Sequence, residues 1–341
     1  MSRAVNVGAI GVGRIGTVHA QDMAFRVPKS RLVAVADANA DAAKKAAQEC
    51  GIKDWYSDYR ELLKRTDIEA VTIATPTHLH LDPAIDAAEA GKHALLEKPL
   101  AYKLREADEI IGAFRRAGVK LQVGHHRRYD PDYLYVKKII DSGEIGKPVM
   151  IKTVSRDPDI PAEDYLRASG GLILDLSPHD LDVIRWLMKS EMKRVYSETG
   201  ALVYPMVKQI GDVDCAMITV LLDSGAIGCV DAGRNSGPGG YDIRAEVLGT
   251  EGSVIMDTKF FSDHRVLLCK RGIHYDTAHW YLERFGQAYL EEVRQFIDCI
   301  IEDKEPKCTG EDGRKALEAS LAAAESAKLH QPINLPFHPT E

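Results

Sequence analysis

The chain has 341 residues, of which 45% are hydrophobic and 28% are charged, and its formal net charge is −7. This length exceeds what one hydrophobic core normally organises, so we expect a globular protein of two domains. The excess of acidic residues argues against broad binding to nucleic acid or to anionic membranes, because either partner would need a basic surface.

The first part of the chain, residues 1–123, alternates short β-branched runs with helical patterns. This alternation predicts a Rossmann domain, in which helices cover both faces of a doubly wound parallel sheet. The expected strands are 5–10, 32–36, 71–74, 94–96 and 121–123, and the expected helices are 40–49, 83–90 and 105–117.

A glycine-rich loop, Gly11-x-Gly13-x-x-Gly16, follows the first strand and opens a helix. Gly11 would allow the tight turn, Gly13 would let the main chain approach a pyrophosphate, and Gly16 would let helix and strand pack closely. The first N–H groups of the helix, including those of Arg14 and Ile15, would bind the phosphates. The alternative is a glycine turn without a ligand, but the flanking strand and helix favour a dinucleotide site.

Asp37 ends the second predicted strand, where an acidic side chain would accept hydrogen bonds from the adenosine ribose hydroxyls. The same carboxylate would repel a 2′-phosphate, and Ala38 and Asn39 follow it with no arginine to hold one. We therefore expect NAD rather than NADP, although the basic residues Arg14 and Lys44 could act against this preference.

The second part, residues 124–341, has a different rhythm, with extended runs separated by turn signals such as Asp223-Ser224-Gly225. This pattern predicts a substrate-binding and oligomerisation domain of the α/β class with an open, mostly antiparallel sheet. A C-terminal helix over 311–329 is expected to pack back on the first domain. The other expected helices are 133–141, 171–188 and 281–302, and the expected strands are 195–203, 215–222, 226–231, 243–248, 253–256 and 266–269.

Within the 171–188 segment, Asp175 and His179 are four residues apart, which places them on one face if a single helix runs through both. The competing interpretation is helix capping, in which Ser177 caps a helix that starts at Pro178. Capping gives Asp175 no task. We favour a helix that runs from Gly171 and bends near Pro178.

The six cysteines are scattered and form no C-x-x-C pair, which favours reduced thiols over a disulfide framework or a zinc site. No stretch approaches the ~20 apolar residues of a membrane span, and the start lacks a secretory signal. We therefore expect a cytoplasmic protein with no membrane partner.

Several motifs carry a resemblance to a known family. The segment 74–101 contains T-P-x-x-x-H at Thr75, Pro76 and His80, and E-K-P at Glu97, Lys98 and Pro99. With the glycine loop, "GHHRRYDPDY", the D-x-x-x-H pair and "GEDGRKALEASLAAAESA", they resemble the glucose–fructose oxidoreductase / inositol dehydrogenase (Gfo/Idh/MocA) family over almost the full chain. Within it the chain most resembles the inositol dehydrogenases. The resemblance implies that Thr75, Pro76, His80, Glu97 and Lys98 lie beside the cofactor.

The chemistry of alcohol oxidation by NAD assigns roles to three residues. A base must take the hydroxyl proton while hydride leaves the same carbon, and His179 is the natural candidate. Asp175 would orient its ring and stabilise the imidazolium. Lys98 would polarise the reacting oxygen. No metal is required.

Further substrate contacts follow from the resemblance. Arg127 would contact the substrate or the nicotinamide amide, and Asp157 and Tyr241 would contact substrate hydroxyls or be plain loop residues. Arg128 is expected to form a structural ion pair. His125 and His126 depart from the family's pattern, so their roles stay open, and two adjacent histidines cannot point the same way from a strand end.

The predicted reaction is the NAD-dependent oxidation of a ring hydroxyl of a cyclic polyol, with myo-inositol converted to its 2-keto form as the first choice. A scyllo-inositol or aldose dehydrogenase is the nearest alternative. An NAD-dependent glycoside hydrolase and a non-catalytic dinucleotide-sensing regulator are further alternatives. The resemblance implies a homotetramer, and a sheet with one uncovered face would suit such assembly.

Overall fold

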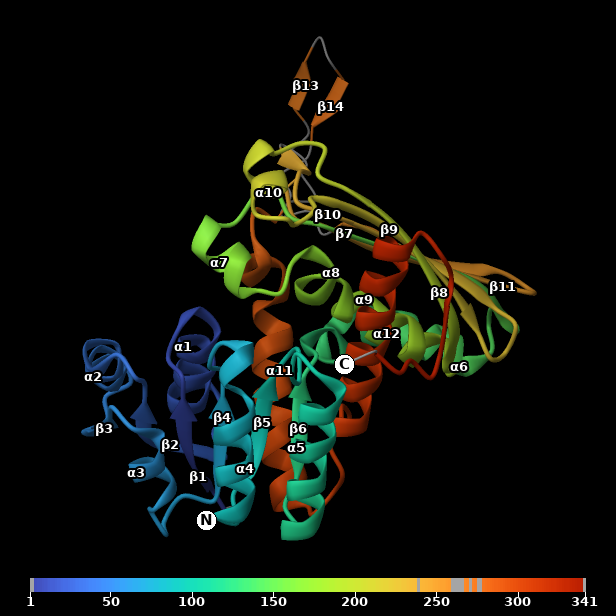
Figure 1. Ribbon diagram of the computed structural model, residues 1–341. Coiled ribbons are helices and arrows are strands. Elements are labelled where there is room, and N and C mark those ends of the chain that lie inside the picture. Colours follow the sequence, from blue (N-terminus) through green and yellow to red (C-terminus); the bar gives the residue numbers. More distant parts are fainter. Residues whose placement is uncertain (1–2, 238–239, 259–266, 270–271, 275–277, 340–341) are drawn as a thin grey trace. The chain divides into compact units, whose positions relative to one another are not determined.

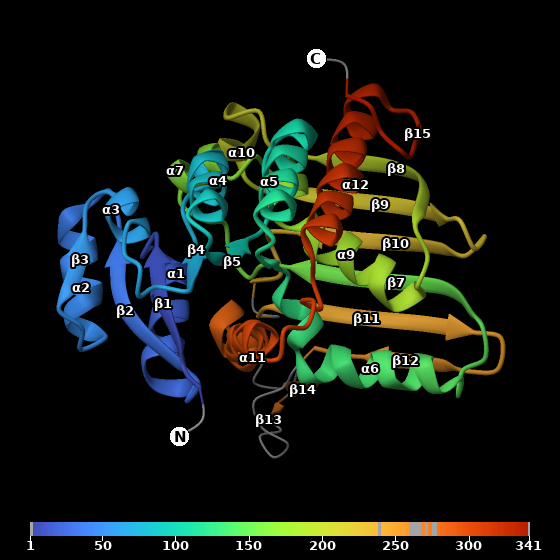
Figure 2. The same cartoon turned by 90° about the horizontal axis from the view of Figure 1, so that it is seen from below.

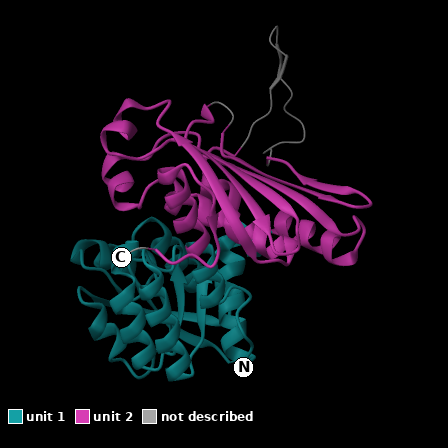
Figure 3. Ribbon diagram, turned by 45° about the vertical axis from the view of Figure 1, so that its right-hand side comes forward, with its two compact units in different colours: residues 1–130, 287–317 teal, residues 131–286, 318–341 magenta. Residues whose placement is uncertain are grey.

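The computed structural model describes residues 3–237, 240–258, 267–269, 272–274 and 278–339. Their contacts divide the chain into two compact units, coloured separately in Figure 3. Unit 1 comprises residues 1–130 and 287–317, and unit 2 comprises residues 131–286 and 318–341. The predicted boundary after residue 123 stays a prediction.

Unit 1 contains a parallel sheet of six strands in the order β3-β2-β1-β4-β5-β6 (Figure 1). Its order reverses between β1 and β4, and in such sheets ligands bind at the carboxyl ends of the strands near this point. The strands are β1 (Val5–Ile10), β2 (Ser30–Ala36), β3 (Asp54–Tyr56), β4 (Ala70–Ile73), β5 (His93–Glu97) and β6 (Leu121–Gly124).

Helices cover both faces of this sheet (Figure 2). On one face, Val5, Val7 and Ala9 of β1 share a hydrophobic core with residues of α1, α2 and α11. On the other face, Gly8 lies against Leu62 of α3, and α4 packs on α5. The helices are α1 (Arg14–Gln21), α2 (Ala40–Glu49), α3 (Tyr59–Leu63), α4 (Leu81–Glu89), α5 (Leu104–Ala117) and α11 (Tyr281–Ile301), with the short turns η1 (Asp22–Arg26), η2 (Thr77–Leu79) and η3 (His126–Tyr129).

Unit 2 is built on a mixed sheet of seven strands in the order β12-β11-β7-β10-β9-β8-β15. Strands β7 and β10 run parallel, and the other neighbouring pairs run antiparallel. The two sheets confirm the predicted fold class. The strands are β7 (Pro148–Arg156), β8 (Met192–Gly200), β9 (Cys215–Leu222), β10 (Ile227–Gly233), β11 (Asp242–Gly249), β12 (Ser253–Met256) and β15 (Ile333–Asn334), with β13 (Leu267–Cys269) and β14 (Gly272–His274) as a separate hairpin.

Helices lie on the face of this sheet that Figure 2 shows. The helix α9 packs on β7 and β10, and α6 packs near β12. The strands alternate, so every second side chain points to the opposite face. Large apolar side chains are exposed there, namely those of Met150, Met217, Ile227, Leu248 and Ile255. The helices are α6 (Pro131–Ser142), α7 (Glu163–Ala168), α8 (Leu172–Asp175), α9 (Ser177–Met188), α10 (Pro205–Gln209) and α12 (Gly310–Leu329).

The predicted 171–188 helix is interrupted. It forms α8 and α9, which are separated by Leu176 with φ −95° and ψ −47°. Pro178 cannot donate an N–H to the preceding turn, which accounts for the break. The helical backbone therefore starts before Pro178, as we favoured, but as two helices rather than one.

Other elements differ in their ends. The predicted strand 195–203 begins and ends three residues earlier, at Met192 and Gly200. Short elements at 54–56, 59–63, 163–168 and 205–209 carry too little periodicity to be predicted. Residue 266 of the predicted strand 266–269 lies outside the described residues. Among the helices of the described chain, none is long and apolar enough to cross a membrane.

Candidate functional site

The glycine loop of unit 1 packs as its sequence requires. Gly11 has a φ of +82°, and a Cβ there would lie 2.7 Å from main-chain atoms of Ala74. A Cβ on Gly16 would lie 1.9 Å from the Gly11 oxygen. Only glycine fits both positions, because the turn is left-handed at Gly11 and α1 approaches the loop closely at Gly16.

The start of α1 is built to receive an anion. A Cβ on Gly13 would meet nothing within 4 Å, and no side chain caps the helix at Gly13. The first N–H groups, from Arg14 onward, therefore have room in front of them, where the helix dipole favours negative charge. This is the environment that a pyrophosphate needs.

Asp37 stands beside this loop with both carboxylate oxygens engaged by main chain. One oxygen accepts the Val12 N–H at 2.9 Å and the other accepts the Asn39 N–H at 2.9 Å. Each oxygen retains a second lone pair that can accept a ribose hydroxyl. Asp37 therefore fixes the glycine loop and can accept further hydrogen bonds at the edge of the loop.

These residues border a cleft of about 830 Å³, which is large enough for a cofactor. Its walls come from the ends of four strands and the loops after them. The lining includes Gly11, Gly13, Asp37, Thr75, Pro76 and Leu79, all of unit 1. The residues present therefore fit a dinucleotide.

Replacing Asp37 by serine should raise the KM for NAD by about 10- to 100-fold, because a charged hydrogen-bond partner is lost. It should also narrow the preference for NAD over NADP, since the repulsion of a 2′-phosphate disappears. Initial rates with both cofactors measure this. Asp41→Ser, in the exposed first turn of α2, is the matched control, and an unchanged KM in Asp37→Ser would contradict the assignment.

His80 joins two loops at the carboxyl edge of the sheet. Its Nε2 lies 2.9 Å from the carbonyl oxygen of Thr75 and its Nδ1 lies 3.0 Å from that of Pro99, so a neutral ring donates its one N–H to one of the two carbonyls. The ring is buried, and burial lowers the pKa of His80. With both nitrogens occupied, His80 acts on the site by holding the Thr75-Pro76 segment against the Lys98-Pro99 segment.

Lys98 follows the last residue of β5, at the edge where ligands of such sheets bind. Its main-chain N–H donates to Glu97 Oε2 at 3.1 Å. The other carboxylate oxygen of Glu97 bonds to the ring of His19 at 2.7 Å. The buried carboxylate of Glu292 on α11 lies beside this pair. One ring nitrogen of His19 and one carboxylate oxygen each from Glu97 and Glu292 lie within 4.8 Å of one another.

The segment after β6 is buried throughout. The ring of His126 lies 4.4 Å from that of Tyr289, centroid to centroid, and Arg127 is 1% exposed. Arg128 donates to the Lys307 carbonyl at 2.9 Å and pairs with Asp312 at 3.1 Å. The predicted structural ion pair of Arg128 is therefore present.

In unit 2, Asp175 is held by two donors from other elements. The Tyr165 hydroxyl of α7 donates to its carboxylate at 3.0 Å, and Arg234 donates to Oδ2 at 2.9 Å. The Arg234 guanidinium is fully buried. Asp175 is thus an anchored carboxylate at the end of α8, four residues before His179 in the first turn of α9.

Capping does not explain this segment. Ser177 is the first residue of α9, and the helix has no side-chain capping hydrogen bond. The Ser177 hydroxyl is buried and has no hydrogen-bond partner among the described residues. The capping-box interpretation is therefore wrong at Ser177.

Asp157 and Tyr241 lie at the same end of the unit 2 sheet. Asp157 follows β7, Tyr241 precedes β11, and the register pairs their neighbours Arg156 and Asp242. The Asp157 N–H also donates to the Gly233 carbonyl at 2.9 Å, next to Arg234. The structure therefore gathers Asp157, Arg234 and Tyr241 at one sheet end, with Asp175 bonded to Arg234.

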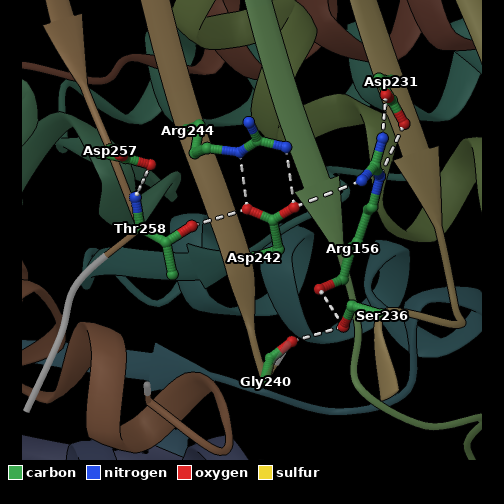
Figure 4. A network of polar contacts seen from close by, with 8 residues as sticks. All are labelled: Arg156, Asp231, Ser236, Gly240, Asp242, Arg244, Asp257 and Thr258. Atoms are coloured by element: carbon green, nitrogen blue, oxygen red, sulfur yellow. Dashed lines mark hydrogen bonds and ion pairs between the residues drawn. The ribbon is translucent and has the colours of Figure 1, made fainter. Parts of the chain in front are cut away.

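A polar network fixes this end of the sheet (Figure 4). The Arg156 guanidinium pairs with Asp231 on β10 and with Asp242 on β11. Asp242 also accepts from Arg244 at 2.8 Å and from the Thr258 hydroxyl at 2.6 Å. The network ties the three strands β7, β10 and β11 together and so fixes the positions of the neighbouring residues Asp157 and Tyr241.

Four residues at these sites were not predicted, namely His19, Tyr165, Arg234 and Glu292. His19 and Glu292 are buried polar residues on the amphipathic helices α1 and α11. A polar residue at a core-facing position of an amphipathic helix is the signal that could have identified them.

Two family profiles match this chain. The profile described as "Oxidoreductase family, NAD-binding Rossmann fold" covers residues 5–125, and the profile of the Gfo/Idh/MocA C-terminal domain covers residues 133–255. The two matches confirm the Rossmann fold and NAD as the cofactor.

Several proteins are similar to this chain over nearly its full length. The chain is 39% identical over 335 residues to scyllo-inositol 2-dehydrogenase (NAD(+)) of Bacillus subtilis, covering 98% of this chain and 97% of that one. It is 34% identical to myo-inositol 2-dehydrogenase of Thermotoga maritima, covering 97% and 98%. The scyllo-inositol dehydrogenase of Lactobacillus casei with bound NAD(H) and scyllo-inositol superposes with a TM-score of 0.92 at 29% identity, covering 97% and 99%.

Proposed function

This chain belongs to the Gfo/Idh/MocA family of NAD-binding oxidoreductases, and on this premise we propose that it oxidises a ring secondary hydroxyl of an inositol. The observation that carries the proposal is the full-length similarity to enzymes named as inositol dehydrogenases. The presence of Lys98, Asp175 and His179 together argues against a non-catalytic regulator, which would need none of them.

His179 would act as the general base and take the proton of the reacting hydroxyl. Asp175 would accept from the other ring nitrogen and stabilise the imidazolium that forms. Its carboxylate is well suited to this task, because hydrogen bonds from Arg234 and Tyr165 hold it in place.

Lys98 would donate a hydrogen bond to the same hydroxyl and stabilise the developing alkoxide. NAD, when bound, accepts the hydride that leaves the carbinol carbon. The glycine loop, Asp37 and the Thr75-Pro76 segment would hold the cofactor. Arg127, Asp157 and Tyr241 would bind the remaining ring hydroxyls, which suits a substrate that carries one on every carbon.

The isomer is a finer question. Sequence analysis favours myo-inositol, whereas the relative of higher identity is named for scyllo-inositol. The two isomers differ only in configuration at the carbon that would be oxidised, and both yield the same ketone there. Hydride would leave from opposite faces of that carbon, so we expect a clear preference for one isomer.

The test is NADH formation with purified protein across inositol isomers and aldoses, with NAD and NADP in parallel. We expect one inositol to give the highest kcat/KM with NAD. Turnover on an aldose alone would favour the sugar dehydrogenase alternative. Glycoside cleavage without net NADH would favour the hydrolase, and no turnover on any polyol would favour the regulator.

Arg234→Met should lower kcat by about 10-fold or more, because Asp175 loses a charged hydrogen bond of about 1.5–3 kcal/mol. Steady-state kinetics on the preferred inositol measure this, with NAD affinity determined by titration. Arg185→Met, which removes an arginine that pairs with Glu191 near the end of α9, is the control. Wild-type kcat in Arg234→Met would show that Asp175 needs no such anchor.

We also propose that the uncovered face of the unit 2 sheet mediates assembly into a homotetramer. A groove of about 570 Å³ on this face is lined by Met150, Ile227 and Leu248 among others. Exposed apolar surface of this kind favours association. Light scattering on the purified protein tests whether it forms a tetramer. A cytoplasmic location stays a prediction.

A further inference from the structure

Three buried titratable groups meet in unit 1, from three elements that are distant in sequence. His19 is on α1, Glu97 ends β5 and Glu292 is on α11. The side chain of His19 is 1% exposed, that of Glu97 is 12% exposed, and Glu292 is fully buried. The part of the chain that the structure describes offers no hydrogen-bond partner to either oxygen of Glu292.

A buried carboxylate in this position needs either a cation or a proton. The distances decide between them. His19 Nε2 lies 2.7 Å from Glu97 Oε1, which is a direct charge-assisted hydrogen bond and shorter than the ~3 Å separation of two ligands of one metal ion. A ring nitrogen that donates its proton to Glu97 cannot bind a metal at the same time. A proton on Glu292 accounts for the geometry without moving any atom.

The surrounding groups lead to the same conclusion. Tyr289 lies edge-on to His19 with centroids 6.0 Å apart, and the His126 ring packs on Tyr289. Asp22 is near His19 at the end of α1, and Gln122 donates to the main-chain oxygen of Glu292. Lys98 follows Glu97 directly in the chain. Burial, and then the charge of Glu97, raise the pKa of Glu292 well above its usual range.

Glu97 is the centre of the cluster and has a second connection. One oxygen bonds to His19, on the helix that follows the glycine loop, while the other accepts the N–H of Lys98. Gly124 on β6 leaves the space for this carboxyl, since a Cβ there would lie 2.9 Å from Glu97 Oε2. The Glu97 carboxylate therefore links the phosphate-binding helix to the segment that carries Lys98.

We propose that Glu292 is held as a neutral carboxylic acid beside the ionised Glu97, and that the His19–Glu97–Glu292 cluster is a proton-binding site that positions Lys98 relative to α1. When Glu292 is protonated, it places no second negative charge beside Glu97, and so it does not compete with Glu97 for the N–H of His19. The positioning role rests on the function proposed for Lys98, whereas the bound proton does not. His19, Glu97 and Glu292 are positioning residues here.

The proton has a consequence for stability whose sign follows from linkage. Above the ordinary pKa of a glutamic acid, the folded protein holds a proton on Glu292 that the unfolded chain has released. The free energy of unfolding therefore falls as the pH rises from that value towards the raised pKa of folded Glu292. Glu292→Gln keeps a neutral side chain of the same shape and removes this loss.

The test uses the full-length variant Glu292→Gln, with Glu291→Gln on the same helix as the matched control, since Glu291 pairs with Arg294 outside the cluster. At neutral pH the infrared difference spectrum of wild type minus Glu292→Gln should contain the C=O stretch of a protonated carboxyl. The Tm advantage of Glu292→Gln over wild type should grow by about 2 °C or more between about pH 5 and about pH 9. Glu291→Gln should show neither effect.

The positioning role has its own readout. The pH profile of kcat/KM should lose activity at higher pH in Glu292→Gln than in wild type, with the two alike at neutral pH. Absence of the protonated-carboxyl band, or stoichiometric metal in wild type that Glu292→Gln loses, would overturn the proton site. If the protonated-carboxyl band is present but the loss of kcat/KM at high pH is the same in Glu292→Gln and wild type, only the positioning role would be overturned. If the protein turns over no inositol, the proposed function fails while the infrared result still stands.

Discussion

Replacing His179 by alanine should lower the rate of NADH formation by about 10²–10⁴-fold, the usual loss when a general base is removed. His179 is on α9 of unit 2, whereas the glycine loop and Asp37 are in unit 1. The affinity for NAD should therefore change little. Initial rates on the preferred inositol and a titration of NAD measure the two effects separately.

The matched control for that variant is His338→Ala, which removes an exposed histidine and should leave both quantities unchanged. Asp175→Asn is an informative companion, because it keeps the shape of the side chain and loses the charge that stabilises the imidazolium. We expect it to lower kcat with little change in NAD affinity. Near-normal turnover in His179→Ala would remove His179 from the mechanism.

Replacing Lys98 by methionine should lower kcat/KM by about 10²–10³-fold, which is typical for the loss of one donor to a developing oxyanion. Methionine has a similar length and no charge, so packing is largely kept. The loss should appear mainly in kcat, because the alkoxide develops only in the transition state. Lys98→Arg should not restore the rate, since a planar guanidinium cannot replace a compact ammonium.

Lys103→Met is the control for Lys98→Met. Lys103 lies a few residues further along at the start of α5 and is largely exposed, with a long ion pair to Glu106. Its replacement should leave the kinetics unchanged. A change confined to the KM for inositol in Lys98→Met would assign Lys98 to substrate binding rather than to polarisation.

The fold was predictable where a short stretch of sequence is enough to define the element that it forms. The strands β1, β2, β4, β5 and β6 are short, largely apolar and largely buried, so their run lengths identify them. The glycine spacing was predictable for the same reason, since the turn at Gly11 and the close packing at Gly16 are demands of local geometry.

The sequence predicted the class of the unit 2 sheet, but it predicted the first and last residues of its strands less well. Its strands alternate between a covered and an open face, and this alternation continues into loops. The strand β8 was placed three residues late for this reason. Elements such as α3 and α10, with five residues each, are too short to show a period.

The site shows a sharper division. Lys98, Asp175 and His179 lie in motifs, so sequence alone could propose them. The partners that hold these residues come from distant parts of the chain: Arg234 is 59 residues from Asp175, and Glu292 follows Glu97 by nearly two hundred. Only the folded chain brings such pairs together, and no local pattern announces them.

The most direct test of the central claim is the fate of the carbinol hydrogen. Inositol that carries deuterium on the carbon to be oxidised is incubated with NAD and the wild-type protein, and the reduced cofactor is analysed by mass spectrometry. We predict NADH that is heavier by the mass of the label, formed together with the ketone, and formed about 10²–10⁴-fold more slowly with His179→Ala. Unlabelled NADH, or a cofactor that stays oxidised with every inositol isomer, would contradict it.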